Sequence, residues 1–281
     1  MKEVNIGFIG GGNMARSMVS GMVASDFKAP NLWVCDKNQD KLGFFQQTYG
    51  VSTCLEQSTL VEKCQVIILA VKPQALPSVV DKVGAEIKKS NALVISICAG
   101  IDMPQLEQWF GEKTAIVRVM PNTPAQLQCG ASAMFANSQL AEQQKNLAEH
   151  IMRASGVAVW IKDESQMNVV GALSGSGPAY FFLLMEMMSD IAVKFGLDEK
   201  QAKLLTTQTA YGASRMALES SEGVAKLRQN VTSKGGITEA AIQTLEKAGI
   251  RAMMEEAMRK NVERGEALSQ LFSSTTKLEN K

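Results

Sequence analysis

A glycine-rich turn between an apolar strand pattern and a helical pattern opens the chain and restricts its fold more than any other segment. The strand candidate is Val4–Ile9, and Gly10-Gly11-Gly12-Asn13-Met14-Ala15 follows it directly. In this G-x-G-x-x-A pattern Gly10 permits the tight turn, Gly12 lets the backbone approach a pyrophosphate, and Ala15 permits close packing of helix on strand. The N–H groups from Gly11 to Met14 would face the phosphates. The segment therefore predicts a Rossmann-type dinucleotide-binding unit.

Short apolar runs alternate with helical patterns as far as residue 162. Most of these runs are rich in Val and Ile and are bounded by Gly, Pro or Asn, as buried strands are. Helical patterns such as Met14–Ala24 and Gln74–Lys88 separate the early runs. The alternation predicts an α/β domain over residues 1–162, a doubly wound and largely parallel sheet. Its expected strands are Val4–Ile9, Leu32–Cys35, Val66–Val71, Leu93–Ile97, Ala115–Val119, Ala131–Phe135 and Val157–Ile161.

The pattern changes near Lys162-Asp163-Glu164, after which we find no convincing strand. We expect an all-α domain over residues 163–281, with helices Glu164–Phe195, Asp198–Leu218, Gly223–Gln229, Thr238–Ala248 and Ile250–Phe272. The first helix should bend or break at Gly171, Gly175, Gly177 and Pro178. Between Met185 and Phe195 its apolar face is too broad for a surface helix. This face predicts burial against other helices, of this chain or of a second subunit.

Composition excludes several classes of protein. The 29 basic and 28 acidic residues nearly cancel, which argues against broad binding to nucleic acid or to anionic membranes. No apolar run reads as long enough to span a bilayer. The chain enters a strand directly from Met1-Lys2-Glu3-Val4, so we expect no secretory signal.

The cysteines and the single histidine limit the chemistry further. An odd, scattered set of thiols without a C-x-x-C pair fits reduced cysteines in a cytoplasm rather than a disulfide frame or a zinc site. The only histidine, His150, lies in a polar helical stretch and should be solvated. We therefore expect no metal site and no mechanism that depends on a histidine base. The cysteines are Cys35, Cys54, Cys64, Cys98 and Cys129.

The second strand candidate ends at Asp36, about 20 residues after the glycine motif, where an acidic side chain usually accepts ribose hydroxyls. A carboxylate there repels a 2′-phosphate and favours NADH. Lys37 follows immediately, however, and could pair with that phosphate. Both residues also fit ordinary turn positions. The choice between NADH and NADPH therefore stays open.

Two proline-containing segments fall at the carboxyl ends of other strands, where ligands bind in open α/β sheets. In Ala70-Val71-Lys72-Pro73-Gln74, Lys72 could contact a ribose or a phosphate. In Met120-Pro121-Asn122-Thr123-Pro124, Asn122 could orient a nicotinamide edge. In both segments a turn shaped by proline is the alternative. The complete predicted cofactor site in this domain is Ile9, Gly10, Gly11, Gly12, Asn13, Met14, Asp36, Lys37, Ala70, Val71, Lys72, Pro73, Cys98, Ala99 and Asn122.

A second glycine turn, Ser233-Lys234-Gly235-Gly236-Ile237-Thr238, runs straight into the helical pattern Glu239–Lys247. Two adjacent glycines can take positive φ and turn their N–H groups towards one point. The helix start adds free N–H groups and a partial positive charge. Such a turn can hold a small carboxylate without Arg or Lys. A plain Gly-Gly loop with Thr238 as helix N-cap is the alternative.

Taken together, these segments resemble the pyrroline-5-carboxylate reductase family over nearly the whole chain. The opening glycine motif alone would fit many dehydrogenases. The order and spacing of three later blocks are specific: Ser174-Gly175-Ser176-Gly177-Pro178-Ala179-Tyr180, then Gln208-Thr209 with Gly212, then Leu227 to Thr238, closed by Leu245-Glu246. The resemblance implies a Rossmann domain and an all-helical domain through which two subunits interlock, with dimers often forming decamers. It also implies an active site between the domains that includes residues of the partner.

The same resemblance implies reduction of 1-pyrroline-5-carboxylate to L-proline by NADH or NADPH, the last step of proline biosynthesis. It assigns Asn230, the backbone of Gly236 and Ile237, and Thr238 to the substrate. With the turn chemistry above, the predicted substrate site is Asn230, Ser233, Gly235, Gly236, Ile237 and Thr238. Glu164 matches a position that approaches the cofactor in some members. The position of Asp36 is commonly Ser or Thr in members that prefer NADPH, which favours NADH here.

For the mechanism, we expect the Gly235-Gly236 turn and the following helix start to anchor the substrate carboxylate while hydride moves from the cofactor to the imine carbon. Thr238 is the predicted catalytic residue, because its hydroxyl could hydrogen-bond the ring nitrogen. A strong acid is not required, since an iminium forms readily in water and hydride transfer depends on orientation and charge placement. Two departures from the family bear on turnover: Lys234 replaces the usual proline, and Ile237 the usual Thr or Ala.

Two other readings stay open at this point. A reductase of another cyclic imine or of a hydroxy acid can also pair a Rossmann domain with a helical one. The hydroxy-acid enzymes need a catalytic lysine in the helical domain, and Lys194 and Lys203 lie in no recognisable active-site motif. A non-catalytic NAD(P)-binding regulator is the third reading, and Lys234 is the one feature that favours it.

Overall fold

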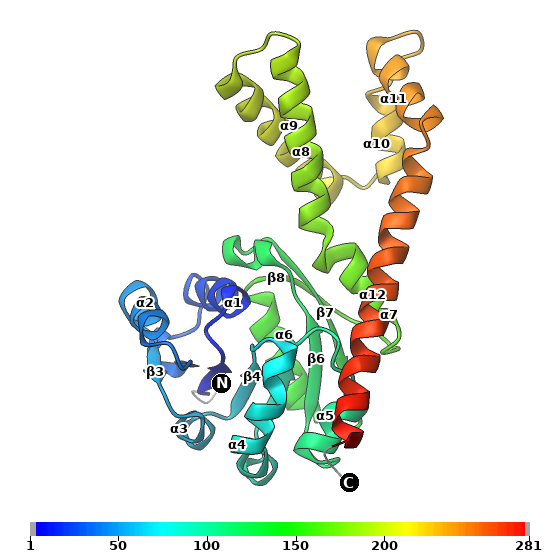
Figure 1. The fold of residues 1–281 in the computed structure, drawn as a ribbon. Helices are drawn as coiled ribbons and strands as arrows, with labels where there is room; N and C mark the ends of the chain where they lie inside the picture. Colours follow the sequence, from blue (N-terminus) through cyan, green and yellow to red (C-terminus); the bar gives the residue numbers. More distant parts are fainter. Residues whose placement is uncertain (1–3, 279–281) are drawn as a thin grey trace. The chain divides into compact units, whose positions relative to one another are not determined.

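The computed structural model describes the backbone of residues 4–278, and side chains as far as residue 271. Its first part is an eight-stranded sheet in the order β3-β2-β1-β4-β5-β6-β7-β8. In Figure 1 the sheet and its helices run from blue to green along the chain. The strands are β1 (Ile6–Ile9), β2 (Leu32–Cys35), β3 (Ser52–Cys54), β4 (Val66–Leu69), β5 (Leu93–Ser96), β6 (Ile116–Met120), β7 (Gly130–Ala136) and β8 (Gly156–Trp160).

The predicted α/β fold is confirmed, and the sheet is largely parallel. Only the pairing of β6 with β7 is antiparallel, and β8 again runs parallel to β7. Seven of the eight strands overlap runs expected from the sequence, and β3 was missed. Its three residues, Ser, Thr and Cys, are partly exposed at the sheet edge, so they lack the apolar signal of a buried strand.

Helices cover both faces of the sheet, because alternate strand residues are buried on opposite sides. Ile6 and Phe8 belong to the core under α1 (Asn13–Val23), α2 (Gln39–Tyr49) and α6 (Glu142–Arg153). Ile9 and Ile67 belong to the core under α3 (Gln57–Lys63), α4 (Leu76–Ser90) and α5 (Met103–Phe110). The order 3-2-1-4-5-6 reverses direction between β1 and β4, where α/β sheets of this kind bind ligands at the carboxyl ends of the strands.

The rest of the described chain is helical, as expected. The predicted break in the first helix is confirmed, because a π-helical turn separates α7 from α8. The elements are α7 (Gln166–Val170), the π-helix η4 (Gly171–Gly175), α8 (Gly177–Lys194), α9 (Glu199–Glu219), α10 (Val224–Asn230), α11 (Ile237–Lys247) and α12 (Ile250–Leu278).

Contacts divide the chain at other positions than the predicted boundary after residue 162. One compact unit, here called the sheet unit, extends to Ser176 and includes the chain from Lys260 onward. The other, the helical unit, is Gly177–Arg259. The end of the last strand at Trp160 agrees with the change of pattern in the sequence, but α7 and η4 pack with the sheet unit.

The helical unit has almost no core of its own. Among its described residues the only buried apolar side chain is Ala202, whereas Phe181, Phe182 and Phe195 are each more than half exposed. An apolar surface of this extent needs a partner. The helical stretch Gln166–Lys194 also passes the length and composition test for crossing a membrane, so the expectation that no apolar run is long enough was wrong. Apolar helices that pack against protein pass the same test.

Candidate functional site

A cleft of about 340 Å³ lies at the carboxyl ends of β1, β2 and β4, at the reversal of strand order. It brings together eight of the predicted cofactor residues: Ile9, Gly10, Gly12, Asp36, Lys37, Ala70, Val71 and Lys72. Cys35, Lys41, Gln57, Ala75, Ser78 and Val79 complete its lining. Topology brings these distant segments together, because parallel strands end at one edge of the sheet.

The first glycine turn has the geometry that close approach of a ligand requires. Gly10 takes φ +106°, donates its N–H to the Cys35 carbonyl at 2.8 Å, and a Cβ there would lie 2.6 Å from the Ala70 carbonyl oxygen. Gly12 is the N-cap of α1, and a Cβ on it would meet only that same oxygen, at 3.9 Å. The cradle beside Gly12 is therefore open at a helix N-terminus. Both features fit the pyrophosphate of a dinucleotide.

The Asp36 carboxylate has three hydrogen-bond donors around it in this cleft. Its Oδ2 accepts the Gly11 N–H at 2.8 Å and pairs with Lys41 Nζ at 3.3 Å, and its Oδ1 accepts the Asn38 N–H at 3.0 Å. Burial raises the pKa of Asp36, but these hydrogen bonds and the Lys41 charge outweigh it and hold the pKa below its ordinary value. The Gly11 N–H, expected to face a phosphate, is thus engaged by Asp36 instead.

The remaining predicted cofactor residues lie outside the cleft lining. Asn13 and Met14 form the first turn of α1, and Pro73 begins a short 3-10 turn. Cys98 is buried, where burial raises the pKa of its thiol to about 11, and its Sγ donates to the Val71 carbonyl at 3.3 Å. Ala99 is exposed. These positions stay predictions for the bound state.

Asn122 has a structural partner at each end of its amide. Its Nδ2 donates to the Ser174 carbonyl in η4 at 3.0 Å, and its Oδ1 accepts the Ala131 N–H at 2.8 Å. The side chain is buried and ties the end of β6 to β7 and to the π-helical turn. The role predicted for it, orienting a nicotinamide edge, would require one of these bonds to open.

Glu164 holds a buried arginine that the sequence interpretation missed. It accepts the Met103 N–H at the start of α5 at 2.6 Å and forms an ion pair with Arg118. Arg118 lies in the middle of β6, and its side chain is 8% exposed. An arginine inside the apolar run Ile116–Met120 was the available signal, because a buried guanidinium requires a partner.

Three cleft residues outside the predicted set also bear on ligand binding. Lys41 lies in α2 and Ser78 in α4, and the helical sequence patterns of these segments carried no signal of a binding role. Gln57 is the first residue of α3, and its Oε1 is buried without a hydrogen-bond partner among the described residues. An unsatisfied buried acceptor beside a cleft favours a ligand that donates a hydrogen bond. No sequence motif marked this residue.

The second glycine turn, in the helical unit, is a type II turn. The Gly236 N–H donates to the Ser233 carbonyl at 3.0 Å, and Gly235 takes φ +72° at the third position, as this turn type requires. Lys234 therefore occupies the second position, which proline favours. Glu239 accepts the Gly235 N–H at 2.7 Å. The N-cap of α11 is Gly236, so the alternative with Thr238 as N-cap was wrong.

These bonds leave a restricted set of donors at the turn. The N–H groups of Gly235 and Gly236 are both engaged, whereas those of Ile237 and Thr238 open the first turn of α11, where no intrahelical acceptor exists. The described contacts give neither of these two a partner outside the helix. Asn230 ends α10, where its Nδ2 donates to Glu222 at 2.8 Å.

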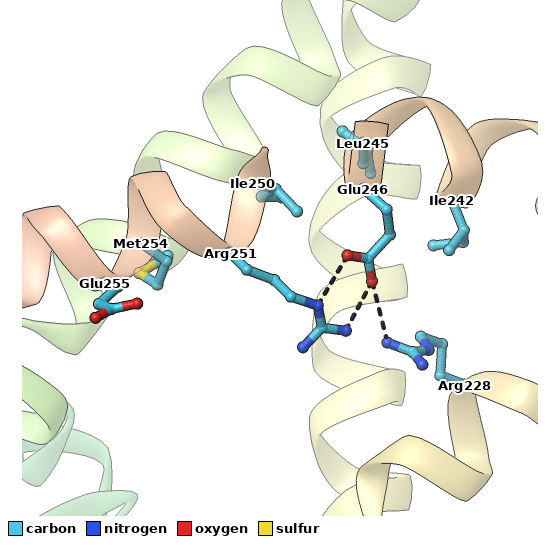
Figure 2. A pocket seen from close by; sticks show the side chains of 8 residues that line it. All are labelled: Arg228, Ile242, Leu245, Glu246, Ile250, Arg251, Met254 and Glu255. Carbon is cyan, nitrogen blue, oxygen red and sulfur yellow. Dashed lines mark hydrogen bonds and ion pairs between the residues drawn. The ribbon is translucent and has the colours of Figure 1, made fainter. Parts of the chain in front are cut away.

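An ion-pair cluster lies in a second hollow of the helical unit, of about 480 Å³. Figure 2 shows Glu246 of α11 between the guanidinium groups of Arg228 and Arg251. The nitrogen–oxygen distances are 2.7 and 2.8 Å to Arg251 and 3.6 Å to Arg228. The Arg251 bonds hold the pKa of Glu246 below its ordinary value. Because α10 and α11 flank the glycine turn, this cluster links the two helices that carry it.

Comparison with known proteins matches both the first part of the chain and its helical part. Residues 164–268 fit the family model for pyrroline-5-carboxylate reductase dimerisation, and residues 5–100 the model described as NADP oxidoreductase, coenzyme F420-dependent. The pyrroline-5-carboxylate reductase of Pseudomonas aeruginosa is 40% identical over 96% of this chain and 98% of its own. Two solved reductases are similar in structure. That of Coxiella burnetii has a TM-score of 0.90 at 43% identity, covering 95% of this chain and 99% of its own. That of Plasmodium falciparum, with NADP bound, has a TM-score of 0.86 at 30% identity, covering 96% and 99%.

Proposed function

The chain belongs to the pyrroline-5-carboxylate reductase family, and from this premise we propose that it reduces 1-pyrroline-5-carboxylate to L-proline with NADH or NADPH. The observation that carries the proposal is that both glycine turns of the family stand in one chain that matches full-length reductases. It is an oxidoreductase of proline biosynthesis. The open alternatives, another reductase or a non-catalytic regulator, have no observation of this kind in their favour.

The cleft of the sheet unit is the proposed cofactor site. The open cradle at Gly12, the α1 N-terminus and Lys72 would hold the phosphates, and Asp36 the adenosine ribose. When bound, the reduced nicotinamide supplies the hydride that reduces the imine carbon. The chain itself supplies position and charge. Asn122, Cys98, Ala99 and Glu164 remain proposed cofactor contacts, although the side chains of Asn122 and Glu164 also bond to other residues of the sheet unit.

The glycine turn of the helical unit is the proposed anchor of the substrate carboxylate. Gly235 and Gly236 shape the turn, while their N–H groups are engaged by Glu239 and Ser233. The donors available to the carboxylate are therefore the N–H groups of Ile237 and Thr238, aided by the positive end of the α11 dipole. Isoleucine is tolerated at position 237 on this account, because only its backbone acts and the residue is 93% exposed.

The hydroxyl of Thr238 is proposed to hydrogen-bond the ring nitrogen and orient it, its oxygen accepting the N–H of the iminium. Thr238 lies in the first turn of α11, next to Ile237, whose N–H is one of the proposed carboxylate donors. Asn230 would contribute to substrate or product binding after exchanging its bond with Glu222. None of these groups needs a shifted pKa, because the iminium forms in water and the barrier falls through orientation.

The protein forms a homo-oligomer, and we propose that the exposed apolar face of α8 and its neighbours is buried in a homodimer. Assembly of such dimers into a decamer is the finer proposal from the family. We place the enzyme in the cytoplasm, with no nucleic-acid or membrane partner, because its free thiols and balanced charge fit that setting.

Oxidation of NADH and NADPH, followed at 340 nm with pyrroline-5-carboxylate, tests the function. Thr238→Ala should lower kcat about tenfold or more, the effect typical of losing one oriented hydrogen bond to the reacting group. The matched control is Thr244→Ala on the same helix, whose hydroxyl donates only to the Ala240 carbonyl, and it should keep full activity. Dinucleotide binding without turnover on any cyclic imine or hydroxy acid would support the regulator instead.

A further inference from the structure

The Asp36 carboxylate, which we propose as the ribose ligand, already has three partners in the cleft. Asp36 Oδ2 already has two donors, Gly11 N–H and Lys41 Nζ, and Oδ1 has one, Asn38 N–H. A carboxylate offers about four lone-pair sites, so roughly one on Oδ1 remains for a further donor. A ribose hydroxyl can supply that donor, whereas a phosphate oxygen cannot.

Lys41 lines the same cleft, and its ammonium group forms an ion pair with Asp36. The two side chains form a pair at 3.3 Å, with Asp36 15% and Lys41 48% exposed. Lys37, next to Asp36, lines the cleft as well. Two lysines therefore line the cleft beside Asp36, and one of them, Lys41, is paired with the carboxylate. Asp36 therefore determines whether the Lys41 charge is available to a ligand.

Gln57 supplies independent support for a ligand that carries donors rather than phosphate. Its side chain lines the cleft together with Asp36 and Lys37, and its buried Oε1 has no partner among the described residues. A hydroxyl or an amino group would satisfy this acceptor. A dianionic phosphate would leave it unsatisfied and would repel it, which costs binding free energy.

We propose that Asp36 makes this protein select NADH over NADPH. We also propose that Lys41 could bind the 2′-phosphate of NADPH, and that its ion pair with Asp36 prevents this. Asp36 acts in two ways: it repels the 2′-phosphate and it withdraws a cation from it. Removing the carboxylate should therefore do more than end a repulsion, because it releases Lys41. The proposal rests on the proposed function only in taking a nicotinamide dinucleotide as the ligand of the cleft.

Fluorescence titration of NADH and NADPH, without substrate, tests the proposal on the full-length protein. The wild type should bind NADPH at least about tenfold more weakly than NADH, because like charges at close range cost several kcal/mol. Asp36→Ser should shift the Kd ratio about a hundredfold towards NADPH. Adding Lys41→Met to that variant should take back about tenfold of the gain, the usual effect of losing one hydrogen bond to a charged group.

Lys72→Met is the matched control, because Lys72 lines the cleft at the end of β4 and should weaken both dinucleotides equally. Asp36→Asn removes the charge but keeps an acceptor for one of the two N–H groups, that of Gly11 or that of Asn38, and should move the ratio in the same direction even if the serine variant folds poorly. Equal or tighter binding of NADPH by the wild type would overturn the selectivity. A double variant that keeps the entire gain would overturn the role of Lys41. Since no substrate is present, a protein that binds NADH selectively yet fails to reduce pyrroline-5-carboxylate would refute the proposed function alone.

Discussion

Removing the Glu164 carboxylate should destabilise the sheet unit strongly. Glu164→Ala leaves the Arg118 guanidinium, 8% exposed in the middle of β6, without its anion, and leaves the Met103 N–H of α5 without its acceptor. Breaking a buried ion pair by deleting one partner costs about 3–5 kcal/mol. The Glu164 side chain is 23% exposed, so water can reach part of the vacated site, and we expect the lower end, about 3 kcal/mol.

Thermal unfolding measures this loss directly. For a unit of this size about 3 kcal/mol corresponds to a fall in Tm of roughly 6–12 °C. Wild type and variant must be compared at one protomer concentration, because assembly adds to apparent stability. The matched control is the double variant Arg118→Met with Glu164→Leu, which removes both charges and should recover most of the stability, as apolar replacements of buried pairs do.

Two results would refute this reasoning. A Tm of Glu164→Ala within about 1 °C of wild type would mean that Arg118 has no need of Glu164. A double variant as unstable as the single one would mean that the loss comes from packing or from the α5 N–H rather than from a stranded charge. The same samples test the expectation that Glu164 approaches the cofactor: a structural role predicts an unchanged NADH Kd at a temperature where the variant is folded.

Three further predictions concern the second glycine turn, the Asp36 carboxylate and the thiols. Glu239→Ala frees the Gly235 N–H and should raise the KM for pyrroline-5-carboxylate several-fold at similar kcat. Adding Lys234→Pro should restore the KM, because proline suits the second position of a type II turn. An unaltered KM in the single variant would mean that the Glu239 bond does not hold the turn in its binding conformation. Because the folded-state pKa of Asp36 lies below its unfolded value of about 3.9, its contribution to stability is present above that value and is lost as the pH falls through the folded pKa. The stability gap between wild type and Asp36→Asn in urea melts should therefore be largest near pH 7 and shrink at pH 3, and a constant gap would contradict the assignment. Cys129, which is exposed, should react with iodoacetamide at pH 8, whereas Cys98 should react only on unfolding, because burial raises the pKa of its thiol to about 11; mass spectrometry distinguishes the sites.

The sequence determined the layered architecture and the location of both glycine turns. Apolar runs alternating with helical patterns identify buried parallel strands, because burial on both faces leaves only apolar residues in them. The glycine patterns mark where the chain turns, and Gly10 and Gly235 take the positive φ that glycine permits. The break before α8 could also be foreseen from its glycines and proline. All of these features depend on residues close together in the chain.

Tertiary structure alone decided which polar groups remain available for binding. The Gly11 N–H is engaged by Asp36, the amide of Asn122 by Ser174 and Ala131, and Glu164 by Arg118, and each of these partners lies on another element. The edge strand β3 was missed for a related reason, since only its pairing with β2 makes it a strand. Local patterns encode backbone conformation and burial, but a hydrogen-bond partner depends on which distant segments the topology brings within about 3 Å. The reaction class could therefore be predicted from sequence, whereas the internal partners that engage Gly11, Asn122 and Glu164 could not.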